Sequence, residues 1–511
     1  MSQYGPEAGE PSDGFKAFLA TFPWLYARPF VRKYFRSLDD PDGRARFAPY
    51  SLRKIEASLG RALGRGEVAV CHPDRLGDCI GARTEAVGIT TMDPLGMGYV
   101  SVTYNPLFPF GRESITAREF GVLMRRIRSL KEKRRFKVLV GGEGTWQVER
   151  SGRAAALGID ALVYGRSDAE IAATFEAVIA GRAPSVVRLF RRPNGPADEV
   201  PPITAPAIYG DVEITRGCGR GCAFCSPNLA RRFSVPLEDV MKEVEVNVGG
   251  GTESVFAVTD DLFLYGADES FRPNRGAVVG LFETIAGFPG VRWIHLSHAS
   301  LAPALTDRAL LPELAPVLVA KSAYKLRGKR YATVEVGLES GSVEIMRRYM
   351  GGKALPLKIG DWPRIVAEGV AHFNENTIYP LGTIVVGWPG ETERDTMATA
   401  GLIESLHAQG LKLFYTPVLF VPIERTPLEE AEGAGLDGLS GPQLSLIERC
   451  WEYNVGLFGS EVPGYWLRIV GLGAKAVGVW RRLTARQGAI HDKLGSFLLR
   501  TKIPCDPGLC D

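Results

Sequence analysis

The sequence predicts an α/β protein built on mostly parallel strands. Two series of short apolar runs alternate with amphipathic helical stretches, over residues 66–182 and 209–430. This alternation is typical of parallel sheets covered by helices. Residues 183–208 are rich in proline and arginine. They show neither a helical nor an alternating pattern of apolar residues, so we expect a linker there. Residues 1–65 should form a helical cap, and residues 431–511 a mainly helical C-terminal region.

Composition predicts a soluble globular protein and does not indicate a nucleic-acid binder. The 511 residues are 45% hydrophobic and 23% charged, and the net charge is only +3. No signal peptide is expected at the N-terminus, and no membrane span, because Arg468 and Lys475 interrupt the most apolar late stretch. The eight cysteines are too few for a disulfide scaffold, and three of them cluster tightly. We therefore expect a cytoplasmic, anaerobic enzyme.

The first series predicts a sheet with a glycine-rich turn. Its expected strands are residues 68–71, 86–92, 99–104, 137–140 and 161–164. Helices are expected at 116–132 and 170–179, and another at 51–63 in the cap. The turn Gly141-Gly-Glu-Gly144 follows one of the strands, and ligands of parallel sheets bind outside the carboxyl ends of strands. By itself this turn is equally compatible with a tight structural bend.

The second series predicts six strand–helix units. The expected strands are residues 211–215, 254–259, 293–297, 333–338, 382–386 and 412–419. The expected helices between them include residues 237–247, 277–285, 343–349 and 394–406, and a later helix is expected at 442–457. Asp260 and Asp261 follow the second strand, and His295, Ser297 and His298 end the third. These groups could bind a ligand, or serve as helix caps and packing residues.

Three cysteines dominate the interpretation. Cys218, Cys222 and Cys225 are spaced C-x3-C-x2-C in a glycine-rich loop. Thiolates suit iron, and glycines let the backbone approach an iron–sulfur cube closely. Three ligands for four irons leave one iron open, which indicates chemistry rather than electron storage. The alternatives are ordinary thiols or an incomplete zinc site, although zinc ligands usually come in pairs from two loops and no partner pair lies nearby.

The spacing, with Phe224 before the last cysteine, resembles the signature of the radical S-adenosylmethionine (radical SAM) enzymes. In that family the open iron binds the amino and carboxylate groups of SAM. The segments Glu335–Ser340 and Gly382–Glu391 resemble later family elements that lie beside SAM. The resemblance implies a partial (β/α)6 barrel holding a 4Fe-4S cluster on the three cysteines. The SAM contacts that it implies are Phe224, Asp260, Asp261, Glu339, Ser340 and Gly387.

The first series resembles the Rossmann-like cobalamin-binding domain of cobalamin-dependent radical SAM enzymes. The resemblance rests on the GG-x-G turn and on the pattern D-x-x-V-x-G-x-x-[DE] over residues 160–168. The cobalamin contacts that it implies are Thr103, Tyr104, Asn105, Gly141, Gly142, Glu143, Gly144, Tyr164 and Gly165. The motif D-x-H-x-x-G is missing and His72 lies in another context, so no lower-axial histidine is expected.

These resemblances imply a C-methyltransferase that uses a 5′-deoxyadenosyl radical and methylcobalamin. It would need SAM, a ferredoxin- or flavodoxin-type electron donor and a carbon substrate. A protein or peptide is the favoured substrate, such as a glutamine of methyl-coenzyme M reductase. The alternatives are a cyclase or rearrangement enzyme, a hopanoid-type lipid methylase, and a non-catalytic iron–sulfur protein. The remaining cysteines could hold a second cluster or be free thiols; they are Cys71, Cys79, Cys450, Cys505 and Cys510.

Overall fold

The computed structural model describes residues 23–25, 42–108, 113–165, 170–189, 201–226 and 232–459. Several expected features lie outside these residues. They are most of the cap, Asp168, and residues 460–511 of the expected helical C-terminal region, which include Cys505 and Cys510.

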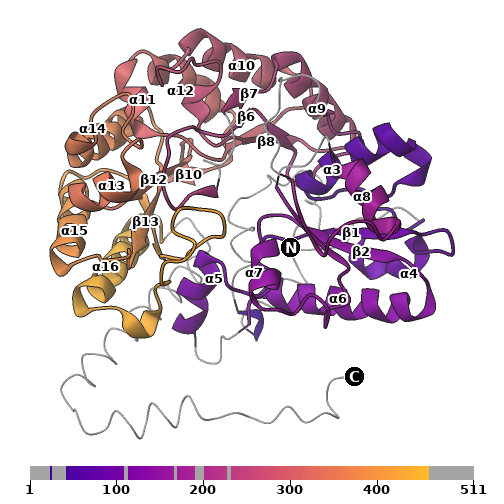
Figure 1. The fold of residues 1–511 in the computed structure, drawn as a ribbon. Helices are drawn as coiled ribbons and strands as arrows, with labels where there is room; N and C mark the ends of the chain where they lie inside the picture. The colour runs from indigo at the N-terminus through magenta and orange to yellow at the C-terminus, as the bar shows by residue number, and fades with distance from the viewer. Residues whose placement is uncertain are drawn as a thin grey trace, which may run out of the picture.

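The N-terminal domain is built on a four-stranded sheet in the order β1-β2-β3-β4, with all neighbours parallel. Its strands are β1 (Ala86–Thr90), β2 (Lys137–Gly141), β3 (Ala161–Tyr164) and β4 (Val186–Arg188). Its helices are α3 (Tyr50–Leu63), α4 (Leu76–Cys79), α6 (Ile115–Lys133), α7 (Thr145–Arg150) and α8 (Ile171–Ile179). Ser114 caps α6 by accepting a hydrogen bond from Ala117 N. This sheet lies at the right in Figure 1.

The predictions of two strands in this domain are wrong. Residues 68–71 form no strand and lie between the 3-10 helices η2 (Arg65–Glu67) and η3 (Pro73–Arg75). Residues 99–104 form a short helix, α5 (Tyr99–Tyr104). Alternation over six residues is too short to separate a strand from one and a half helical turns, and packing against the second domain decides the outcome. The strand β4 also lies inside the expected linker.

The second domain has the six parallel strands that the sequence predicts. β5 (Asp211–Glu213), β8 (Ser254–Val258) and β9 (Trp293–Leu296) form one sheet, and β12 (Glu335–Glu339), β13 (Leu381–Val386) and β14 (Phe414–Leu419) form another. A parallel bridge between His298 and Glu335 joins β9 to β12, so the strands make one open barrel. Two short antiparallel pairs flank it: β6 (Thr215–Arg216) with β7 (Phe233–Ser234), and β10 (Lys325–Leu326) with β11 (Lys329–Arg330).

Helices cover the outside of this barrel and form an arc in Figure 1. They are α9 (Leu237–Gly249), α10 (Arg275–Gly287), α11 (Leu301–Thr306), α12 (Leu310–Ala320), α13 (Val343–Met350), α14 (Trp362–Glu375), α15 (Glu393–Ala408) and α16 (Gly441–Phe458). The shorter 3-10 turns are η4 (Asn105–Leu107), η6 (Leu262–Leu264), η7 (Ile359–Asp361) and η8 (Leu436–Gly438).

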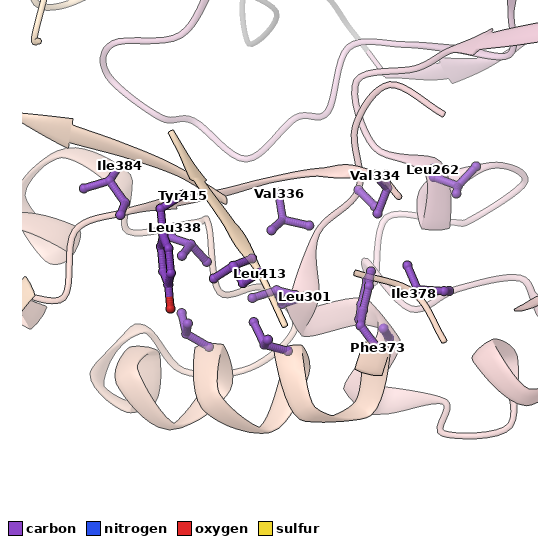
Figure 2. Close-up of a cluster of buried hydrophobic side chains, with 14 of the residues drawn as sticks. Leu262, Leu301, Val334, Val336, Leu338, Phe373, Ile378, Ile384, Leu413 and Tyr415 are labelled. Atoms are coloured by element: carbon purple, nitrogen blue, oxygen red, sulfur yellow. The ribbon is translucent and has the colours of Figure 1, made fainter. Parts of the chain in front are cut away.

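Alternation along β12 decides which side chains face the barrel interior. Figure 2 shows Val336 and Leu338 on the helix side, where both are buried in the main core. Successive side chains of a strand point to opposite faces. Glu335 and Gly337 therefore face the interior of the barrel. The register of β12 shifts between Gly337 and Glu339, where Glu339 has φ 60°, and the contacts of its carboxylate with Lys353 and Thr383 place it on the same side.

The open edge of β14 is covered by side chains from both domains. Asn454 of α16 pairs with the backbone N–H and C=O of Tyr415, at 2.8 and 2.7 Å. Further along, Tyr104 Oη donates to Pro417 O at 2.6 Å, and Leu419 N donates to Thr103 Oγ1 at 2.8 Å. Pro417 has no N–H to leave unpaired at this edge. Helix α5 thus belongs to the packing of the barrel.

Candidate active site

The three cysteines lie in a loop that follows β6 and needs glycine at alternate positions. Gly217, Gly219 and Gly221 have φ angles of 72°, 72° and 75°, which only glycine adopts at little cost. Cys225 N donates to Cys222 O at 3.3 Å, and Ala223 N donates to Tyr349 O at 2.8 Å. These bonds hold the loop against the end of α13.

A buried ion pair anchors the same loop. Arg220 Nη2 lies 2.9 Å from Asp261 Oδ2, and the two side chains are 3% and 1% exposed. Arg220 also donates to Leu355 O at 2.7 Å. Asp261 Oδ1 accepts from the backbone N–H groups of Phe263 and Ser300. The structure therefore gives Asp261 a loop-anchoring role, and its predicted SAM contact stays a prediction. Arg220 was not among the predicted site residues.

The neighbouring carboxylate, Asp260, takes part in the loop differently. Its Oδ2 accepts a hydrogen bond from Gly217 N, and the side chain is only partly buried. Asp260 is thus held at the start of the cysteine loop, where the sequence predicts a contact with SAM.

The thiols share one poorly hydrated environment. Burial raises the pKa of Cys218 to about 11, with the nearby Cys222 and Asp261 adding to the effect. Burial also raises the pKa of Cys225, with further contributions from Cys218 and Cys222. Among the described residues no three side chains are arranged around a single metal ion. Three thiols within one glycine-rich loop are the kind of ligands that iron–sulfur clusters use.

A lysine that the sequence analysis missed lies between the thiols and β12. Lys353 Nζ is 2.8 Å from Glu339 Oε1, with side-chain exposures of 17% and 7%. Burial alone would lower the pKa of Lys353, but Glu339 and the thiols of Cys222 and Cys225 raise it overall. A side chain at Gly337 would overlap both partners, so this glycine makes room for the pair. Nothing local marks Lys353, because its partners come from elsewhere in the chain.

Other predicted SAM residues lie around the same end of the barrel. The Phe224 ring meets Trp388 edge-on at 5.2 Å between centroids, which brings the cysteine loop beside the turn after β13. Gly387 has φ 83°, and its N–H donates to Glu391 Oε2 at 2.7 Å. The Ser340 hydroxyl lies 3.1 Å from that of Thr399 on α15, so it also fixes the strand end.

In the N-terminal domain, the glycine-rich turn is required by close packing. Gly142 has φ 94°, and a Cβ there would overlap the backbone of Thr91 after β1. A Cβ at Gly144 would overlap Pro94, and one at Gly141 would lie 3.4 Å from Val163 O. At its three glycines the turn therefore packs backbone closely against the neighbouring segments, and Glu143 is the one residue of the turn that carries a side chain.

The carboxyl end of this sheet meets the cysteine loop. Ser226, which follows Cys225, donates to Glu143 Oε2 at 3.3 Å. Burial is the largest cause of the raised pKa of Tyr99 on α5. The nearby Glu335, Glu339 and Cys225 raise this pKa further. The Tyr99 side chain is still 48% exposed. The two predicted sites therefore adjoin each other.

The remaining predicted cobalamin residues have other partners or none. Thr103 and Tyr104 bind the edge of β14, as described above, and Tyr164 lies beneath the Arg188 guanidinium, 5.1 Å from its ring centroid. Asn105 is buried, and within the described ranges its side-chain oxygen has no hydrogen-bond partner. Gly165 has φ 97° at the end of β3. Cobalamin contacts at these five positions stay predictions.

Comparison with known families identifies the second domain. Residues 212–403 match the Radical SAM superfamily. This part of the chain is therefore a radical SAM domain, and the prediction made from the cysteines and strand-end motifs is confirmed. In the described residues, no helix is long and apolar enough to cross a membrane.

Among curated relatives, the chain is similar to ribosomal protein uS12 methylthiotransferase RimO. A Thermus thermophilus protein of this name is 30% identical over 48% of this chain and 54% of its own length. The Cytophaga hutchinsonii protein is 26% identical over 42% and 44%. The chain thus spans about half the length of the curated relatives it matches.

Among solved structures, it is similar to the radical S-adenosylmethionine methyltransferase TsrM from Kitasatospora setae, whose structure contains cobalamin and a [4Fe-4S] cluster. The sequence identity is 18%, the match covers 75% of this chain and 74% of that one, and the TM-score is 0.49.

Proposed function

We propose that the protein is a cobalamin-dependent radical SAM methyltransferase that methylates a carbon atom. The observation that carries the proposal is the contact between Ser226 and Glu143, 3.3 Å apart. It joins the residue after the third cysteine to the glycine-rich turn of the N-terminal sheet. Two cofactors held at these places would share one reaction space, which direct methyl transfer to a carbon radical requires.

The chain's residues suit a [4Fe-4S] cluster. Cys218, Cys222 and Cys225 would be its ligands, since their thiols already influence one another in a glycine loop. The buried pair of Arg220 and Asp261 fixes this loop before a cluster binds. The rings of Phe224 and Trp388 exclude water from one side.

SAM would lie between this loop and β12. The carboxylate of Asp260, oriented by Gly217 N–H, would hold the SAM ammonium group. Lys353 supplies a fixed positive charge beside the thiols, suited to the SAM carboxylate, and Glu339 keeps it in place. When bound, cluster and SAM supply a 5′-deoxyadenosyl radical, and cobalamin supplies the methyl group.

The carboxyl end of the N-terminal sheet suits a large, flat ligand. Gly142 and Gly144 themselves carry no side chains, and the apolar Met92, two residues after β1, is 78% exposed. Tyr99 stands at the border between this end and the barrel. A corrin bound there would cover Met92 and face the barrel interior.

Anaerobic reconstitution tests the proposal. The whole chain would be loaded with iron, sulfide and hydroxocobalamin, freed of unbound cofactor, and examined by absorption spectroscopy. We expect bound corrin, an iron–sulfur chromophore, and 5′-deoxyadenosine from SAM under a strong reductant. A cluster without bound corrin would leave a radical SAM enzyme of another kind, and no 5′-deoxyadenosine would favour a non-catalytic iron–sulfur protein.

Product analysis separates the remaining activities. A gain of one methyl group, with two SAM molecules consumed for each product, supports the proposal. A methylthio gain would align the protein with its curated relatives, and consumption of one SAM without a mass gain would indicate a cyclase or rearrangement enzyme. A flavodoxin- or ferredoxin-type protein is the proposed electron donor, and a protein or peptide the favoured substrate.

A further inference from the structure

We propose that the barrel interior below the pair Glu339–Lys353 binds a cationic group of the substrate, an amine or a guanidinium, through the carboxylate of Glu335. This inference rests on the proposed function, because it concerns the substrate of the same site. The match to the Radical SAM superfamily does not specify the charge of the substrate.

Position makes Glu335 an interior residue. It begins β12, and its neighbour Val336 is buried on the helix side (Figure 2). Because successive side chains of a strand point to opposite faces, the Glu335 carboxylate faces inward. Two residues further along the same face lies Gly337, followed by Glu339 with its partner Lys353. Glu335 is therefore the next acidic group below the predicted SAM contacts.

Charge around Glu335 is unbalanced. Lys353 is committed to Glu339. Within the described part of the chain, His298 is the one basic side chain within ion-pair distance of Glu335, at 3.6 Å, and it is 53% exposed. Tyr99 approaches from the N-terminal domain and brings no positive charge. A carboxylate in a partly enclosed site, 32% exposed, gains most from a cationic partner that binds there.

A second, independent observation points to a ligand at this place. Thr416 on β14 is 5% exposed, and its hydroxyl has no hydrogen-bond partner among the residues that the structure describes. It pairs in register with Thr383, which pairs with Gly337. The Thr383 hydroxyl lies 3.5 Å from Glu339 Oε2, so this row faces the interior. The Thr416 hydroxyl therefore lies at the level of Gly337, two residues further along the strands than Glu335.

A buried hydroxyl without a partner costs free energy. A substrate whose cation binds Glu335 and whose next polar atom reaches Thr416 would satisfy both groups. With Tyr99 near Glu335, such a substrate would be held below the cluster and next to the N-terminal domain. This arrangement favours small amines, or lysine and arginine side chains of peptides, over neutral lipids.

The test compares charged probes with neutral ones of the same shape. The reconstituted holoprotein with SAM would be titrated by equilibrium dialysis with N-acetyl-arginine amide and N-acetyl-citrulline amide. The second pair is N-acetyl-lysine amide and its side-chain-acetylated form. We expect the cationic member of at least one pair to bind about tenfold more tightly or better. Equal binding within both pairs, or binding of neither cation, would overturn the proposal.

Substitutions test whether Glu335 and Thr416 cause the preference for cationic probes. Glu335→Gln keeps the shape and should abolish the preference for the cation, whereas Glu344→Gln on the exposed side of α13 removes the same charge and should keep it. Thr416→Val should weaken binding of the preferred probe; unchanged binding would remove Thr416 from the site. Thermal unfolding checks that the variants are folded.

Binding is measured without turnover, so the two proposals fail separately. Preference for cations with no 5′-deoxyadenosine would contradict the proposed function alone. Formation of 5′-deoxyadenosine without that preference would contradict this inference alone.

Discussion

The ammonium nitrogen of Lys353 lies 2.8 Å from Oε1 of Glu339, and this ion pair adjoins the thiols of Cys222 and Cys225. Removing one partner of a buried pair leaves the other charge uncompensated, which typically costs about 3 to 5 kcal/mol. Lys353→Met should therefore lower stability by about 3 kcal/mol and weaken SAM binding. Chemical denaturation and equilibrium binding of SAM measure the two effects.

The matched control for this pair is Lys358→Met, since Lys358 is exposed a few residues away. The double variant Lys353→Met, Glu339→Gln should regain much of the lost stability, because no buried charge is left unpaired. Additive losses in the double variant would show that the two side chains do not interact.

Each of the three loop cysteines should be needed for the cluster. Alanine at Cys218, Cys222 or Cys225 should abolish the iron–sulfur absorption and most bound iron. Cys450→Ala should retain both, because Cys450 is buried on α16, which packs on α15 and β14. Normal absorption in any of the three loop variants would contradict the assigned ligand set.

Thiol reactivity offers a pH test of the loop without its cluster. Burial raises the pKa of Cys218 to about 11, so this thiol should remain mostly protonated at pH 8. Its alkylation by iodoacetamide should be slower in the folded apoprotein than in the denatured chain, and should rise as pH approaches 11. Mass spectrometry of tryptic peptides measures the rate of alkylation. Equal rates at pH 8 would show an exposed, unperturbed thiol.

The glycine-rich turn gives a test specific to cobalamin. Gly142→Ala should displace the turn from Thr91 and lose corrin binding, with the iron–sulfur absorption intact. Gly152→Ala is the control, because Gly152 also has a positive φ, 65°, but an added Cβ meets nothing within 4 Å. It should cost only about 1 kcal/mol. Corrin bound to the Gly142 variant as tightly as to the unmodified protein would argue against a site at this turn.

A buried histidine predicts acid sensitivity. Burial lowers the pKa of His295 from 6.5 to about 4. Between these two pH values the unfolded chain binds a proton at His295 and the folded chain does not. The free energy of unfolding therefore falls by about 3 kcal/mol as the pH drops from 6.5 towards 4. His295→Phe should flatten this part of the profile, and His407→Asn, which changes an exposed histidine, should not. Denaturant midpoints across this range provide the measurement.

The contact between α5 and β14 predicts a coupling of the two domains. Tyr104→Phe removes the donor to Pro417 O and should cost about 1 kcal/mol. It should also raise proteolytic cleavage between the domains. Tyr453→Phe on α16 alters a tyrosine whose ring stacks on His407 and serves as the control. Identical digestion of both variants would show that Tyr104 does not hold the domains together.

The barrel was predictable because each of its strands is a short apolar or alternating run with clear ends, followed by a helical period. The segment 99–104 was not, because its fate is decided by hydrogen bonds to Pro417 and Leu419, more than 300 residues away in the chain. The same distinction holds in the site. The cysteines and Glu339 belong to local motifs, whereas Lys353, Arg220 and Tyr99 matter through partners distant in sequence.

The covered edge of β14 also limits how this protein can be divided. In the whole chain, Asn454, Tyr104 and Thr103 occupy the outward backbone groups of the last barrel strand. A fragment starting at residue 201 would keep Asn454 but lack α5, and so would expose part of that strand. Exposed strand edges pair with other chains. The radical SAM domain expressed alone would therefore tend to self-associate, and a loss of activity in it would say nothing about cobalamin.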